Sequence, residues 1–198
     1  MSPVDGPGCA DGAVGDVLIT EAQIAERIAT LGARITADYA GRTPLLVSVL
    51  KGSLVFVADL MRAVDGPVEI DFLAVSSYGA ATRSSGVVRI LKDLDSDVAG
   101  RDVLVVEDIV DSGLTLSYLL DRLRSQQPAS LATCTLILRT AGDGADPDRP
   151  VCGDLPIDYV GFRLPPSFVV GYGLDAGQRY RNLPYIARYL APEGPETA

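Results

Sequence analysis

The chain contains no histidine, and only three of its 198 residues are cysteines. The lack of histidine excludes Ser/His and Cys/His triads and any histidine general base. The cysteines, at positions 9, 134 and 152, are odd in number and irregularly spaced, so they suggest neither a disulfide framework nor a zinc site. No apolar run reaches about 18 residues, and the N-terminus lacks a basic region followed by an apolar one. We therefore expect a cytoplasmic protein without a membrane partner.

Basic residues are also in the minority, with 17 Lys and Arg against 26 Asp and Glu and a net charge of −9. This balance argues against nucleic acid as the main partner. The net charge does not exclude an anionic substrate, because a divalent metal and a few cationic side chains can bind it locally. The length suits one domain, which we place at residues 17–190. Residues 1–16, rich in Gly, Pro, Ala and Asp, are expected to be a disordered tail, and residues 191–198 a frayed one.

The most informative stretch starts with the aliphatic run 103–106, which predicts a strand buried on both faces. Carboxylates follow at Glu107, Asp108 and Asp111. The next residues precede a helical pattern and are, in order, Ser112, Gly113, Leu114 and Thr115. A strand that ends in such a loop presents free N–H groups and the positive end of a helix dipole, which together receive phosphate. The acids could hold ribose hydroxyls or a hard cation, or move a proton. The alternative is a buried strand with a solvated acidic turn.

The stretch is not a Walker loop, because it contains no Gly-Lys-Ser/Thr. A second strand, turn and helix precede it, at residues 44–50, 51–53 and 54–64. The turn begins with Lys51 and Gly52, at the strand end where open α/β sheets bind ligands. A lysine without a role, exposed in a loop, is the alternative.

Residues 68–75 predict a third strand, which runs into a small, polar loop at 76–86. A short returning strand at 87–91 would make this segment a long hairpin, either a lid or a solvated turn. Thr20 and Gln23 predict a capping box that opens an amphipathic helix. The remaining elements expected are a helix to about 126, a strand at 130–138, a loop at 141–156, short strands at 157–162 and 168–172, and an edge strand at 185–190. The alternation of strand and helix predicts a parallel sheet covered on both faces.

A second diagnostic region covers residues 158–162 and 168–175. Phe168 offers an aromatic face for a flat heterocycle. The main chain at Val169 could read the edge of that ring, and Asp175 could bind a metal. The alternative is a pair of core strands with an acidic turn.

Residues 107–115 closely resemble the phosphoribosyl-diphosphate binding motif of the phosphoribosyltransferase family. The triplet 50–52 resembles the pyrophosphate loop of the 6-oxopurine members, in which the peptide before the lysine can be cis. Residues 77–79 resemble their flexible lid, and residues 158–175 their base-binding region. The resemblance is to bacterial hypoxanthine/guanine enzymes and runs from about Thr20 to Leu190. It implies an α/β type I phosphoribosyltransferase fold, with a central parallel sheet flanked by helices, a small hood and a flexible lid hairpin.

The resemblance also implies a Mg²⁺-dependent enzyme of purine salvage that transfers 5-phosphoribosyl from phosphoribosyl diphosphate to N9 of hypoxanthine or guanine. Asp111 would be the proton acceptor or relay near N7 of the base, and Glu107 and Asp108 would hold the ribose hydroxyls directly or through the metal. The implied contacts of the 5-phosphate are Ser112, Gly113, Leu114 and Thr115. Those of pyrophosphate are Lys51, Gly52 and Arg181, with Asp175 on its Mg²⁺. Those of the base and lid are Arg139, Phe168, Val169, Ser77 and Tyr78.

Two positions depart from the family pattern. Arg139 stands where the family has a lysine that meets the 6-oxo group of the base, and arginine is longer and planar. Ala176-Gly177 replaces a bulky or acidic pair and would loosen the loop beside the base. Base preference is therefore open, and an enzyme for xanthine or another base is one alternative. A regulator that binds phosphoribosyl diphosphate or a nucleotide without turnover is another. Family members are commonly dimers or tetramers, so we expect a homodimer or homotetramer.

Overall fold

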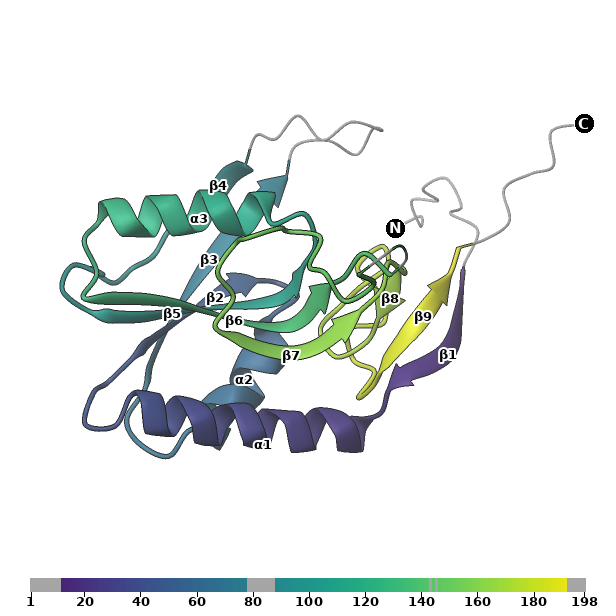
Figure 1. Cartoon of the computed structure of the whole chain (residues 1–198), viewed down its shortest axis with the longest axis horizontal. Coiled ribbons are helices and arrows are strands. Elements are labelled where there is room, and N and C mark those ends of the chain that lie inside the picture. The colour runs from purple at the N-terminus through teal and green to yellow at the C-terminus, as the bar shows by residue number, and fades with distance from the viewer. Residues whose placement is uncertain (1–11, 78–87, 143, 145, 192–198) are drawn as a thin grey trace, which may run out of the picture.

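The computed structural model describes residues 12–77, 88–142, 144 and 146–191. Its main feature is a six-stranded sheet in the order β4-β3-β2-β5-β6-β7 (Figure 1). Its strands are β2 (Leu45–Leu50), β3 (Glu69–Ser77), β4 (Val88–Lys92), β5 (Asp102–Val110), β6 (Ser130–Arg139) and β7 (Tyr159–Leu164). All neighbours pair in parallel except β3 and β4, which are antiparallel. The predicted α/β class with a central parallel sheet is confirmed.

Helices cover both faces of this sheet (Figure 1). The helices α1 (Glu21–Asp38) and α2 (Leu54–Ala63) lie on one face, and α3 (Leu114–Ser125) lies on the other. The capping box predicted for α1 is present, with reciprocal bonds between Thr20 and Gln23. None of the described helices is both long enough and apolar enough to span a bilayer.

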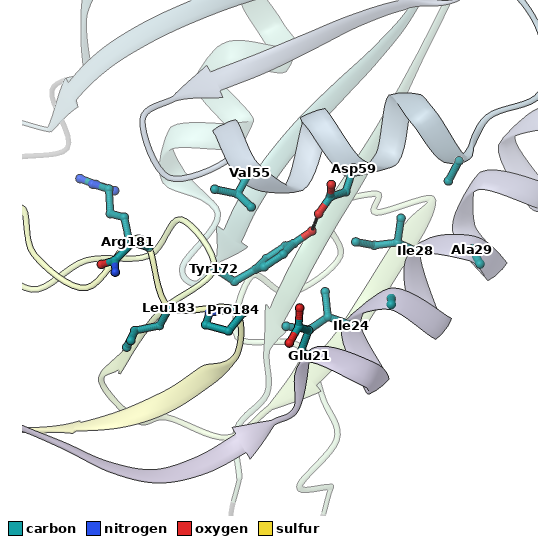
Figure 2. Close-up of a pocket in the computed structure, with 13 residues that line it drawn as sticks. Glu21, Ile24, Ile28, Ala29, Val55, Asp59, Tyr172, Arg181, Leu183 and Pro184 are labelled. Carbon is teal, nitrogen blue, oxygen red and sulfur yellow. Dashed lines mark hydrogen bonds between the residues drawn. The ribbon is translucent and has the colours of Figure 1, made fainter.

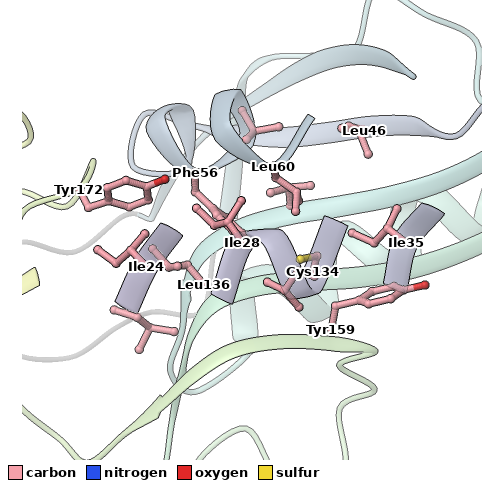
Figure 3. Close-up of a cluster of buried hydrophobic side chains, with 14 of the residues drawn as sticks. Ile24, Ile28, Ile35, Leu46, Phe56, Leu60, Cys134, Leu136, Tyr159 and Tyr172 are labelled. Carbon is pink, nitrogen blue, oxygen red and sulfur yellow. The ribbon is translucent and has the colours of Figure 1, made fainter. Parts of the chain in front are cut away.

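Two apolar cores result from this layering. Figure 3 shows the core under α1 and α2, where Ile28 and Ile35 of α1 meet Phe56 of α2 and Cys134 of β6. The second core lies under α3 and takes residues of opposite parity from β2 and β5. The central strands β2 and β5 are therefore buried on both faces, as their continuous aliphatic sequences predict.

A smaller antiparallel sheet forms the hood, in the order β1-β9-β8. Its strands are β1 (Ala13–Ile19), β8 (Val169–Val170) and β9 (Ile186–Leu190). The expectation of disorder is wrong for residues 13–16, because they pair with β9 and Gly12 N donates to Tyr189 Oη at 3.1 Å. The expectation of an edge strand at 185–190 is also wrong, because β9 lies between β1 and β8. Both errors concern a pairing between the two ends of the chain, which no local pattern reveals.

The predicted hairpin is confirmed, with Ser77 of β3 paired to Val88 of β4. The proposed lid residue Tyr78 and the rest of the loop to residue 87 lie outside the described residues. Helix α3 begins at Leu114, two residues before the leucine pattern indicates, and its N-cap is Gly113, in a left-handed conformation. Strand β8 is shorter than the stretch expected at 168–172.

Candidate active site

The loops that carry the predicted site residues meet at one edge of the main sheet. Strands β2, β5 and β6 are parallel neighbours, so their carboxyl ends place Lys51, Asp111 and Arg139 on the same edge. The approach of the loops is close enough to require glycine at two positions. A Cβ on Gly52 would lie 1.5 Å from Asp108 Oδ2, and a Cβ on Gly173 would lie 2.1 Å from the Gly52 carbonyl oxygen. The turn after β8 is thus packed directly against the Lys51 loop.

Residues 112–116, here called the amide loop, present unused N–H groups. In the part of the chain that the structure describes, no acceptor takes these five amides, and the first bond of α3 runs from Ser117 N to the Gly113 carbonyl at 2.8 Å. Gly113 has φ +76°, and a Cβ there would lie 2.8 Å from Cβ of Cys152, so glycine is required on two grounds. The amide loop and Glu107 line a cavity of 130 Å³. This arrangement suits an anion of phosphate size.

Of the two carboxylates at the end of β5, Glu107 is buried and Asp108 is half-buried. Burial, followed by the charge of Asp108, raises the pKa of Glu107 well above its ordinary value. Burial also raises the pKa of Asp108 to about 6, against the opposing effect of the Ile109 N–H, which donates to Oδ1 at 2.8 Å. Glu107 faces the amide loop, whereas Asp108 lies against Gly52. A bound cation, or ligand hydroxyls that donate to these carboxylates, would lower both pKa values and favour the charged forms.

A second cavity of 500 Å³, here called the edge cavity, adjoins the amide loop. Its lining combines carboxylates, one arginine and one exposed aromatic ring, and consists of Asp108, Ile109, Asp111, Arg139, Pro166, Ser167, Phe168, Val169, Leu174 and Asp175. Six residues predicted from the sequence thus surround one cavity. Asp111 is exposed and lines both this cavity and the cavity of the amide loop, so it stands where the two meet. Phe168 is 58% exposed, so its ring is accessible to a flat ligand.

Arg139 is at the wall of the edge cavity but is 6% exposed. Its Nη1 donates to the Pro165 carbonyl at 2.9 Å, and its Nη2 donates to the Ser167 carbonyl. The guanidinium is therefore hydrogen-bonded to the segment that immediately precedes Phe168.

The opposite corner of the site gathers Lys51, Asp175 and Arg181. Arg181 Nη2 lies 2.7 Å from Asp175 Oδ1, and Nη1 donates to the Gly173 carbonyl at 2.7 Å. Gln178, which sequence reasoning missed, connects the group, because its Oε1 accepts from Lys51 Nζ at 3.3 Å and from Arg181 at 3.3 Å. Only its place in a turn after Asp175 could have pointed to it. The peptide bond between residues 50 and 51 is cis.

The turn at residues 176–179 is closed by two reciprocal backbone bonds, of 3.2 Å and 3.1 Å, between Ala176 and Arg179. Gly177 has φ +58°, which glycine adopts without strain. The departure from the family pattern at Ala176-Gly177 thus falls in a turn closed by these two bonds, and the expected loosening of the loop stays a prediction.

Among the described residues, no three His, Cys, Asp or Glu side chains converge as a ready-made metal site. The expected ligands Glu107, Asp108 and Asp175 therefore do not form a closed cage. Mg²⁺ usually takes one or two carboxylates and completes its shell with water and substrate oxygens. The raised pKa of the Asp108 carboxyl, beside a corner rich in donors, fits a cation that arrives with an anionic substrate.

A cavity of 520 Å³ behind the site was not foreseen from the sequence. It lies between α1, α2 and the chain at 181–184, and Figure 2 shows Tyr172 reaching across it to Asp59 on α2. The Tyr172 hydroxyl donates to Asp59, and the Tyr172 N–H donates to the Leu183 carbonyl at 2.8 Å. The bond to Asp59 holds the turn before Asp175 against α2, and the bond to Leu183 joins it to the chain before β9; Tyr172 has φ +50°.

Comparison with known proteins identifies the family of the chain. Residues 18–176 match the phosphoribosyl transferase domain family. A hypoxanthine-guanine phosphoribosyltransferase of Mycobacterium avium is 53% identical over 181 residues, covering 88% of this chain and 85% of that protein. The enzyme of that name from Bacillus subtilis strain 168 is 50% identical over 170 residues, covering 86% and 90%. The crystal structure of a hypoxanthine phosphoribosyltransferase from Staphylococcus aureus superposes with a TM-score of 0.80 at 42% identity, covering 91% of this chain and 93% of that one. The chain belongs to the hypoxanthine-guanine phosphoribosyltransferases of the phosphoribosyl transferase domain family.

Proposed function

We propose that the protein transfers 5-phosphoribosyl from phosphoribosyl diphosphate to N9 of hypoxanthine or guanine, giving IMP or GMP and pyrophosphate in purine salvage. One observation carries the proposal: the unused N–H groups of residues 112–116 and the aromatic-walled edge cavity meet at Asp111. A phosphate and a flat base bound at these two places would put the sugar between them, beside the acids of β5. The names of the relatives support the same reaction.

The substrate would follow the layout of the site. The amides of residues 112–116 would hold the 5-phosphate, and Glu107 and Asp108 the ribose hydroxyls. The donors of Lys51, Gly52 and Arg181 would meet pyrophosphate. The remaining contacts, with the base, would come from Phe168 and Val169, and Arg139 lies in the wall of the same cavity.

The reaction requires mainly that the chain position the substrates and stabilise the charges that develop on them. The bond from C1 to pyrophosphate breaks ahead of attack and leaves a sugar with oxocarbenium character, so the site must stabilise positive charge on the sugar and negative charge on the leaving group. Asp111, exposed at the mouth of the edge cavity, would take or relay the proton at N7 of the base. Ser77 and Tyr78 would belong to a lid that excludes water from the sugar.

Mg²⁺ fits the carboxylates of this site. Glu107, Asp108 and Asp175 would hold it together with substrate oxygens, in one or more positions. When bound, the metal would neutralise charge on the pyrophosphate that leaves. We also propose a single domain at residues 17–190, to which residues 13–16 of β1 add, a cytoplasmic location, and a homodimer or homotetramer.

The test is a panel of bases. The protein is incubated with phosphoribosyl diphosphate, Mg²⁺ and each of hypoxanthine, guanine, xanthine and adenine, and pyrophosphate release is measured. We expect turnover with hypoxanthine and guanine. Turnover confined to xanthine or adenine would contradict the proposed base. No release with any base, although phosphoribosyl diphosphate binds, would favour a regulator without turnover.

A further inference from the structure

The contacts of Arg139 differ from those of a side chain that is free to read a base. The residue ends β6 and pairs with Leu164, the last residue of β7. Its guanidinium spans the turn that follows, with Nη1 on the Pro165 carbonyl at 2.9 Å and on Ser167 Oγ at 3.4 Å, and Nη2 on the Ser167 carbonyl. No carboxylate of the described residues forms an ion pair with it. Its partners are therefore two main-chain oxygens and one side-chain hydroxyl, all of the same turn.

That turn has few donors of its own. Two of its residues are prolines, at 165 and 166, and proline has no N–H. After the turn, the next anchor is the Phe168 carbonyl, which accepts from Tyr189 N at 2.8 Å. Apart from Arg139, the only hydrogen-bond donor that the described residues offer to the carbonyls of residues 165 and 167 is the Ser167 hydroxyl, which lies 3.4 Å from the Pro165 oxygen. Since Phe168 and Val169 follow directly, the geometry of the turn determines where they stand in the edge cavity.

We propose that Arg139 is a positioning residue, whose guanidinium bridges the carbonyls of Pro165 and Ser167 and so fixes Phe168 and Val169 against the base. This inference rests on the proposed function for the identity of the ligand. The bridge requires the planar fork of arginine, because its two terminal nitrogens donate to two oxygens at once. A lysine at this position would keep the positive charge and a donor but would lose the fork. The role should therefore affect all purine bases alike.

The first experiment needs no substrate. Hydrogen exchange of residues 164–170 is compared in the wild type, R139K and a matched control, R163K, which changes an exposed arginine on the adjacent strand β7. Loss of the bridge should speed exchange of this segment in R139K by about tenfold, as the loss of one or two hydrogen bonds implies. R163K should exchange like the wild type. Unchanged exchange in R139K would overturn the proposal.

The second experiment separates positioning from base reading. We expect R139K to raise the KM for hypoxanthine and for guanine by about the same factor, near tenfold. The KM for phosphoribosyl diphosphate should stay within about twofold, because the amide loop is untouched. A base-reading Arg139 would give the opposite result, since a lysine still donates to a 6-oxo group. An unchanged or lower KM for the bases, or an altered ratio of hypoxanthine to guanine, would overturn the proposal.

The two experiments also distinguish this inference from the proposed function. If the wild type turns over no base, the proposed function fails, and the exchange experiment alone decides the role of Arg139. If the wild type is active and R139K equals it in both experiments, only the inference fails. R139Q, which is neutral and cannot span both oxygens, serves as a second variant and should change exchange in the same direction.

Discussion

Replacing Asp108 by asparagine should make the ligand-free protein more stable while it weakens substrate binding. The pKa of Asp108 is raised to about 6 by burial, so the folded state holds this carboxylate at a cost when it is charged. Asparagine keeps an oxygen that can accept the Ile109 N–H, but it has no charge to bury. The variant therefore removes the cost and keeps the local hydrogen bond.

The magnitude follows from the pKa. A change from the ordinary 3.8 to about 6 corresponds to about 3 kcal/mol, at roughly 1.36 kcal/mol per pKa unit. Because Asp108 borders the edge cavity and water screens it, we expect about half of this, or about 1.5 kcal/mol. For a domain of this size that is an increase in Tm of roughly 3–6 °C.

The effect should depend on pH in a defined way. As the pH rises from about 4 to about 6, the unfolded chain loses the Asp108 proton before the folded chain does, so wild-type stability falls across this window. The variant has no such proton. The gain in unfolding free energy of Asp108→Asn over the wild type should thus reach about half its full value at pH 5 and its full value above about pH 6.5.

The assay is urea unfolding and calorimetry at pH 5.0 and pH 7.5, in EDTA and without substrate. Asp121→Asn, an exposed change on α3, is the matched control and should shift stability little. In turnover assays with Mg²⁺, Asp108→Asn should raise the KM for phosphoribosyl diphosphate by about tenfold or more. A variant less stable than the wild type at pH 7.5, or an advantage equal at both pH values, would refute the reasoning.

Three further substitutions test neighbouring parts of the site. Gly173→Ala places a Cβ 2.1 Å from the Gly52 carbonyl oxygen at φ +97°, so unfolding in urea should show a loss of about 3 kcal/mol; a loss below about 0.5 kcal/mol would contradict the close packing. Asp111→Asn should lose most turnover, by a factor of about 10² or more, while calorimetry still detects phosphoribosyl diphosphate binding; unchanged turnover would remove Asp111 from the proton relay. Tyr172→Phe deletes the bond to Asp59 and should lower the free energy of unfolding by about 1 kcal/mol, which an unchanged Tm would contradict.

The parts of the fold that were predictable depend on local sequence. The aliphatic runs of β2 and β5, the capping box of α1 and the loop that begins at Asp111 are each contained in a short stretch. Once the strands are parallel, their carboxyl ends must share an edge, so the meeting of Lys51 and Asp111 followed from order alone.

The parts that were not predictable depend on contacts between distant residues. The pairing of β1 with β9 joins segments near the two ends of the chain, and the sequence of neither strand predicts which strand it pairs with. Gln178 joins Lys51 to Arg181 through one side-chain oxygen. The engagement of Arg139 with main-chain carbonyls is equally invisible in sequence, because those acceptors exist in every residue.

The central claim is that residues 112–116 grip the sugar phosphate while the acids of β5 face the ribose. Amide chemical shifts of the ¹⁵N-labelled protein, titrated with ribose 5-phosphate, test it most directly, because this ligand carries the phosphate and hydroxyls without base or pyrophosphate. We predict that the largest saturable shifts fall on the amides of residues 112–116 and on Glu107 and Asp108. Saturable binding that leaves those amides unmoved would contradict the account.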